Sequence, residues 1–135
     1  MPRLYREAPL NSIWEGSGNV NALDVLRAMG REPESVTAFM SEVDEARGSD
    51  PRLDRAIDEL KQQLTNGAGS EAGARRLVER MAIVLEGSLL VRHGDPAVAD
   101  AFCASRIGGD WGHSFGTLPE GLQLASIVQR HRPAS

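Results

Sequence analysis

A single carboxylate beside two glycines is the part of this sequence best suited to chemistry. Glu15 stands in the stretch Trp14-Glu15-Gly16-Ser17-Gly18-Asn19, just before apolar residues with helical spacing. Gly16 and Gly18 permit close backbone approach, so we predict a tight loop that enters a helix. Shielding from water would raise the pKa of Glu15 towards that of a general base. The alternative is that Glu15 only stabilises the positive end of the helix.

The neighbours of Glu15 suit the binding of an anion and an apolar group. Ser17 and Asn19 stand at the predicted helix start, where backbone N–H groups can hold a phosphate or ribose, although both residue types are also common N-caps. Trp14 could desolvate Glu15 or narrow a substrate cleft, and plain core packing is the alternative. The residues alone leave these alternatives open.

The rest of the chain has helical periodicity, without a segment of strict apolar alternation, so we predict an all-α helical bundle. Expected helices cover residues 20–29, 33–43, 51–64, 71–92, 97–106 and 122–129, with a loop over 108–121. Gly30 is expected to end the first, and Asp50-Pro51 and Asp95-Pro96 to start two others. The helix over 71–92 is the longest and most apolar. We expect it at the centre, with Leu77, Met81, Leu85 and Leu89 packed on Leu53, Ile57, Leu60 and Leu64.

Composition excludes several classes of function. The chain has 135 residues and a net charge of −4, so it fits one domain, and any contact with nucleic acid must be local. Cys103 is the single cysteine and is expected in the core, and three scattered histidines lack metal-ligand spacing, so no metal site is predicted. The apolar run over 81–91 is too short to span a bilayer, and no signal peptide is visible. A cytoplasmic protein without membrane contact is therefore expected.

Basic residues form one candidate surface. Arg76 and Arg80 share a helical face with Arg75 adjacent, which suits contact with DNA phosphates. Solvated charge is the alternative, because Glu71 and Glu79 neutralise part of this face. In the later loop, Trp111 and Phe115 are expected to hold the chain against the domain.

The first thirty residues resemble the acyl-CoA dehydrogenase family. Tyr5-Arg6-Glu7-Ala8, followed by Ile13-Trp14-Glu15-Gly16-Ser17, is similar to the family's Tyr-Arg-Asp-Ala and Ile-Tyr-Glu-Gly-Thr. Trp-Glu-Gly-Ser-Gly-Asn is typical of the AidB-like branch, which is linked to the response to DNA alkylation. Residues 1–30 thus resemble the end of the catalytic helical domain, and residues 31–135 resemble the C-terminal helical extension of that branch.

The resemblance implies roles for the motif residues. In the family the motif glutamate removes the α-proton of an acyl-CoA while the β-hydrogen leaves as hydride to FAD, and Glu15 occupies that position. Gly16, Ser17 and Asn19 stand where relatives contact FAD, and Trp14 stands beside the substrate. Serine and asparagine replace the usual threonine and glutamine, which shortens their reach to the cofactor.

The resemblance also implies the setting of the chain. We expect N-terminal dehydrogenase domains that supply most of the flavin site, a homotetramer, and contact with double-stranded DNA, for which Arg76 and Arg80 are the candidates. Alone, the chain is expected to be inactive and without flavin. The alternative is a non-catalytic helical module for oligomerisation or DNA binding.

Overall fold

Helices make up the regular structure of the described part of this protein. The computed structural model describes residues 2–12, 18–65, 71–111 and 114–132. These contain no strand, which confirms the predicted all-α class. The α-helices are α1 (Pro2–Glu7), α2 (Gly18–Arg31), α3 (Pro33–Asp44), α4 (Pro51–Thr65), α5 (Ala74–His93), α6 (Pro96–Phe102) and α7 (Leu124–Arg130). Two 3-10 helices, η1 (Ala8–Ser12) and η2 (Glu71–Gly73), and one π-helix, η3 (Cys103–Ile107), complete the elements.

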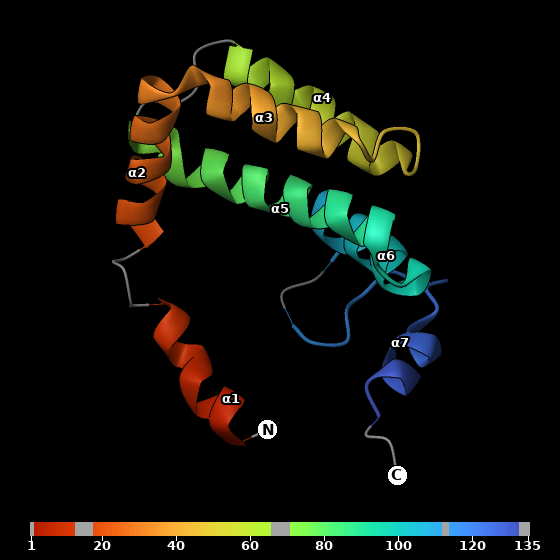
Figure 1. Ribbon diagram of the computed structural model, residues 1–135. Helices are drawn as coiled ribbons and strands as arrows, with labels where there is room; N and C mark the ends of the chain where they lie inside the picture. The colour runs from red at the N-terminus through yellow and green to blue at the C-terminus, as the bar shows by residue number, and fades with distance from the viewer. Residues whose placement is uncertain (1, 13–17, 66–70, 112–113, 133–135) are drawn as a thin grey trace.

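The central element is α5, as predicted. Figure 1 shows α3 and α4 side by side along α5, α2 at the N-terminal end of α5, and α6 near its C-terminal end. All four pack on α5, and η3 contacts both α4 and α5. A helix covered on several sides needs a wide apolar face, and the predicted helix over 71–92 had one.

The predicted buried face of α5 is wrong at its C-terminal end. Leu77 is buried, but Met81 and Leu85 are only half-buried and Leu89 is 42% exposed. The buried residues there are instead Val84, Gly87 and Ser88. A Cβ atom on Gly87 would lie 2.5 Å from Ile107 Cδ1 and 3.3 Å from Leu53 Cδ1, so η3 and α4 approach α5 on its glycine side. This approach turns Leu89 away from the core.

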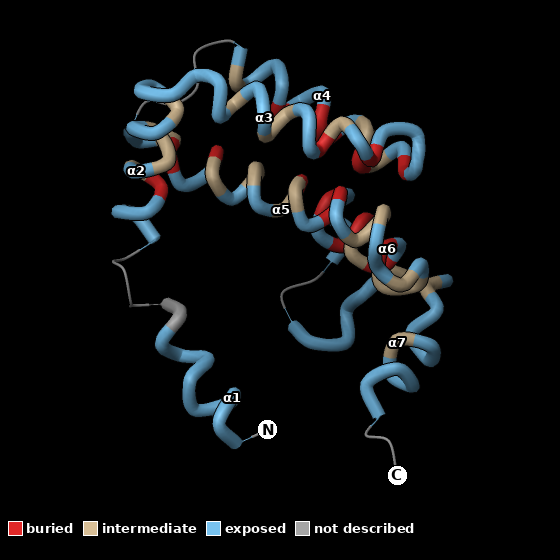
Figure 2. Tube along the Cα trace, in the orientation of Figure 1, coloured by how far each residue is buried: buried red, intermediate tan, exposed pale blue. Residues whose placement is uncertain are grey.

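The apolar residues predicted to form the contact face of α4, here called the α4 seam, lie in the core. Leu53, Ile57 and Leu60 are fully buried, and Leu64 is half-buried at the end of the helix. They pack with residues of α3, α5 and η3, namely Val43, Leu77, Val84, Cys103 and Ile107. Figure 2 shows buried positions on the sides of α4 and α5 that face each other, and further buried positions around α6.

Local signals set several helix ends. The backbone N–H groups of Arg52 and Ala97 donate to the side chains of Asp50 and Asp95 at 2.8 and 2.9 Å, which confirms both predicted starts. The predicted end at Gly30 is wrong, because α2 continues to Arg31. The break comes instead at Glu32, whose backbone is pushed out of the helical region by the following Pro33.

Ion pairs join α4 to its neighbours. Arg52 Nη2 lies 2.6 Å from Asp50 Oδ2 and 2.7 Å from Asp100 Oδ1, which links the start of α4 to α6. Asp50 is 9% exposed, and its hydrogen bonds from Arg52 lower the pKa of its carboxyl. Burial, aided by Asp50, raises the pKa of the neighbouring Cys103 thiol to about 11. Asp50 is thus held charged and Cys103 neutral.

The N-terminal arm, α1 with η1, extends away from the bundle (Figure 1). Leu4 is 67% exposed and Tyr5 and Leu10 are also exposed. The expected docking of this arm on further domains stays a prediction, as does a domain boundary at residue 30. The structure does pack α2, which precedes that boundary, on α5, which follows it.

Truncation of the α4 seam should test this core. Leu60→Ala should lower the free energy of unfolding by about 2–5 kcal/mol, because it removes apolar contacts and leaves a cavity. The matched control is Leu4→Ala on the arm, which should cost about 0.5 kcal/mol or less. Urea denaturation followed by circular dichroism measures both. Equal losses would show that the arm is packed as tightly as the core.

The contribution of the Asp50 carboxylate to stability should depend on pH. Because the folded pKa lies below the unfolded value of about 4, the carboxylate stabilises the fold above that pH and loses this effect as pH falls through the folded pKa. Asp50→Asn keeps an N-cap but not the charge, so it should be less stable than the unsubstituted chain at pH 6, and the difference should shrink as the pH falls through the folded pKa of Asp50. The exposed Asp110→Asn should show no such difference. Parallel stability curves for Asp50→Asn and the unsubstituted chain would contradict this account.

Candidate functional site

The motif around Glu15 is described only at its end. Trp14, Glu15, Gly16 and Ser17 lie outside the described residues, so their roles stay predictions. Gly18 and Asn19 are described as the first two residues of α2, and both are exposed. The predicted helix after the motif is therefore present, and it begins at Gly18.

The N-terminus of α2 is suited to an anion. The helix has 14 residues and no acidic residue in its first turn. Its first N–H groups lack intrahelical carbonyl partners, and the aligned peptide dipoles give this end a positive potential. Ala22, one turn further, is buried, so the helix start is held in place by the bundle.

Arg75 adds a second source of positive charge at this point. Its Nη2 atom lies 3.8 Å from the position a Cβ would take on Gly18. Within the described ranges, Arg75 forms neither an ion pair nor a side-chain hydrogen bond, and it is exposed. The arrangement brings a guanidinium from α5 to the end of the motif, a geometry that can bind phosphate oxygens.

Sequence reasoning missed this role of Arg75. It placed Arg76 and Arg80 on one basic face and treated Arg75 only as an adjacent residue. Only the packing of α2 on the N-terminal end of α5 brings Arg75 beside Gly18. No local pattern in the sequence carries that information.

Arg76 and Arg80 lie on a surface of mixed charge. Arg80 Nη2 is 2.6 Å from Glu59 Oε2 of α4, and the two side chains join α5 to α4. A shallow cavity of about 270 Å³ here is lined by Glu59, Glu79 and both arginines, with Gln63 and Ile83. The ion pair offsets the charge of Arg80. Contact of this face with DNA stays a prediction.

The remaining candidates take structural places. Cys103 is buried and unpaired, as predicted. Across the described ranges no three His, Cys, Asp or Glu side chains are grouped as metal ligands, and no described helix has the length and hydropathy to cross a membrane. The expectation that Phe115 holds its loop against the domain is wrong, because this side chain is fully exposed.

Comparisons with known proteins relate the chain to proteins named as acyl-CoA dehydrogenases. No protein-family model matches it. The Escherichia coli K12 protein named "Putative acyl-CoA dehydrogenase AidB" is 38% identical over 76% of this chain and 19% of its own length. "Acyl-CoA dehydrogenase family member 11" of Caenorhabditis elegans is 28% identical over 74% of this chain and 19% of its own length. The chain thus spans about a fifth of the length of these curated relatives.

Proposed function

Because this chain is related to the AidB-like acyl-CoA dehydrogenases, we propose that it forms the C-terminal part of an FAD-dependent enzyme of that type. One structural observation carries the proposal. The described end of the motif, Gly18 and Asn19, opens a helix whose positive N-terminus lies beside Arg75. That arrangement fits the pyrophosphate of a dinucleotide such as FAD.

Glu15 is the proposed base. Its carboxylate takes the α-proton of an acyl-CoA thioester, so that the Cα–H electron pair can form the new double bond. FAD supplies the acceptor for the hydride that leaves the β-carbon. Trp14 is proposed to shield this carboxylate from water, which would strengthen it as a base. The product is an α,β-unsaturated thioester.

Four residues are proposed to hold the cofactor. Gly16 allows the loop to pass close to it, and Ser17 and Asn19 offer a hydroxyl and an amide at the start of α2. Arg75 contributes a charge that pairs with phosphate. The absence of acidic residues from the first turn of α2 supports this assignment, because a carboxylate there would repel the phosphate.

The complete protein is proposed to act in the cytoplasm as a homotetramer, with N-terminal domains that provide the remaining flavin contacts. A single loop and helix end cannot retain a dinucleotide alone. Contact with DNA in the alkylation response, through Arg76 and Arg80, is a further part of this proposal. The ion pair between Arg80 and Glu59 gives that part no support.

Replacement of Glu15 should separate cofactor binding from chemistry. In a fusion of this chain to the preceding domains of the Escherichia coli relative, Glu15→Gln should keep bound flavin but slow acyl-CoA-dependent bleaching by at least about a hundredfold, the usual scale for loss of a general base. The amide keeps the shape of the side chain and removes the base. Anaerobic stopped-flow absorbance measures the rate.

The control for this experiment is Glu120→Gln, which changes an exposed carboxylate of the later loop. It should bleach as fast as the unsubstituted fusion. Unchanged bleaching in Glu15→Gln would assign the base to another residue. An unsubstituted fusion that binds flavin but is not bleached by any acyl-CoA would favour the non-catalytic alternative.

Arg75 should affect retention of flavin rather than proton transfer. In the same fusion, Arg75→Gln should weaken flavin binding about tenfold, because a hydrogen-bonded charge is lost from the phosphate. Arg55→Gln removes the same charge from an exposed position on α4 and should leave affinity unchanged. Flavin released on dialysis, measured by fluorescence, tests both variants. Equal affinities for the two would remove Arg75 from the cofactor site.

A further inference from the structure

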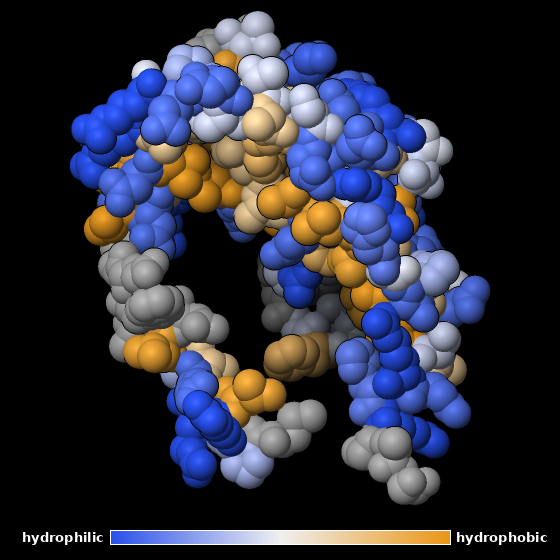
Figure 3. Space-filling view, viewed as in Figure 1, coloured by the Kyte–Doolittle hydropathy of each residue, from blue (hydrophilic) through white to orange (hydrophobic). Residues whose placement is uncertain are grey.

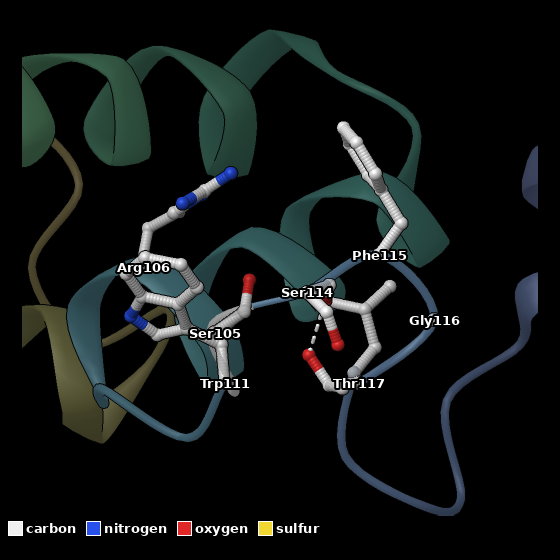
Figure 4. Close-up of a pocket in the computed structure, with 8 residues that line it drawn as sticks. Ser105, Arg106, Trp111, Ser114, Phe115, Gly116 and Thr117 are labelled. Atoms are coloured by element: carbon white, nitrogen blue, oxygen red, sulfur yellow. Dashed lines mark hydrogen bonds between the residues drawn. The ribbon is translucent and has the colours of Figure 1, made fainter.

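A second cavity lies between η3 and the loop that follows it, on elements that do not carry the Glu15 motif. Its volume is about 600 Å³, within the range of small-molecule sites. Figure 4 shows Arg106 and Trp111 on one side, Phe115 on the other, and Ser114 and Thr117 between them. Leu118 completes the apolar wall.

Three of the side chains that line this cavity are large, apolar and exposed. Phe115 is fully exposed, and Trp111 and Leu118 are 48% and 43% exposed. Large apolar side chains that gather around a hollow gain free energy when a ligand removes them from water. Two of the three are aromatic, so a flat ring is the shape that they contact best.

Arg106 gives the cavity its charge. Its guanidinium carbon lies 4.9 Å from the centre of the Trp111 ring, a cation–π contact that holds the side chain over the indole face. No described carboxylate forms an ion pair with Arg106, so its N–H groups can serve an incoming anion. Thr117 Oγ1 donates to the Ser114 carbonyl at 2.6 Å, and this bond orders the turn that carries Phe115.

We propose that this cavity binds a small organic anion with an aromatic body. The ring lies between Trp111 and Phe115, and the carboxylate or phosphate of the ligand pairs with Arg106. Among the described residues that line the cavity, Arg106 is the one with a charge. Apolar walls with such a cation are typical of sites in which burial supplies affinity and a charge sets orientation. The inference does not depend on the function proposed for Glu15.

Calorimetric titration of the whole chain with naphthalene probes tests the site. 2-Naphthoate should bind about tenfold more tightly than the uncharged 2-naphthamide, the scale of one hydrogen bond to a charged group. Arg106→Gln should abolish that difference, and Arg55→Gln, which removes an arginine from α4, should preserve it. Phe115→Ala should weaken both probes. 2-Naphthyl phosphate, used in parallel, decides whether carboxylate or phosphate is preferred.

Several outcomes would overturn the proposal. The first is the absence of naphthoate and naphthyl phosphate binding at millimolar concentration, with the fold intact by circular dichroism. The second is binding that Arg106→Gln and Phe115→Ala both leave unchanged. The third is Arg106-dependent binding of a single-stranded oligonucleotide without binding of either naphthyl anion, which would assign the surface to nucleic acid. Loss of self-association in Phe115→Ala, without probe binding, would assign it to a second copy of the chain.

Discussion

The close approach of α5 to η3 and α4 at Gly87 determines how the other helices are arranged. With no side chain at this position, Ile107 and Leu53 fill the space that a Cβ would occupy, and Val84 and Cys103 join them in one core. The arrangement has a cost, because the hydroxyl of the adjacent Ser88 is fully buried and has no hydrogen-bond partner among the described residues. The absence of a side chain at Gly87 is therefore explained by the short distance between the helices.

Much of the fold could be predicted because its signals are local. Asp50-Pro51 and Asp95-Pro96 start helices through bonds within a few residues, and the spacing of Leu53, Ile57 and Leu60 identifies a buried face without knowledge of its partner. The exposure of Leu89 could not be predicted, because the rotation of α5 depends on where η3 packs. The position of Arg75 beside Gly18 could not be predicted for the same reason, and the role of Glu15 rests on resemblance alone.

The packing of α2 on α5 joins two parts of the chain that the sequence suggests are separate. The helix that follows the motif buries Ala22 and sets Leu26 and Met29 against the same core as α4 and α5. Any change that loosens α5 would therefore move the start of α2, which directly follows the motif with Glu15 in the sequence. The later helices would then influence the position of the proposed base through ordinary packing, without a dedicated signalling element.

The π-helix η3 determines the number of residues in the turn that follows α6. The N–H group of Gly108 donates to the carbonyl of Cys103, five residues earlier, so one residue more than an α-helical turn is accommodated there. Deletion of one residue within Cys103–Ile107 would return this turn to α-helical spacing and leave Ile107 directed at the core, whereas a further insertion would displace both Ile107 and Arg106. Homologues that keep this core should thus differ here by the loss of one residue more readily than by a gain, which natural sequence variation would record.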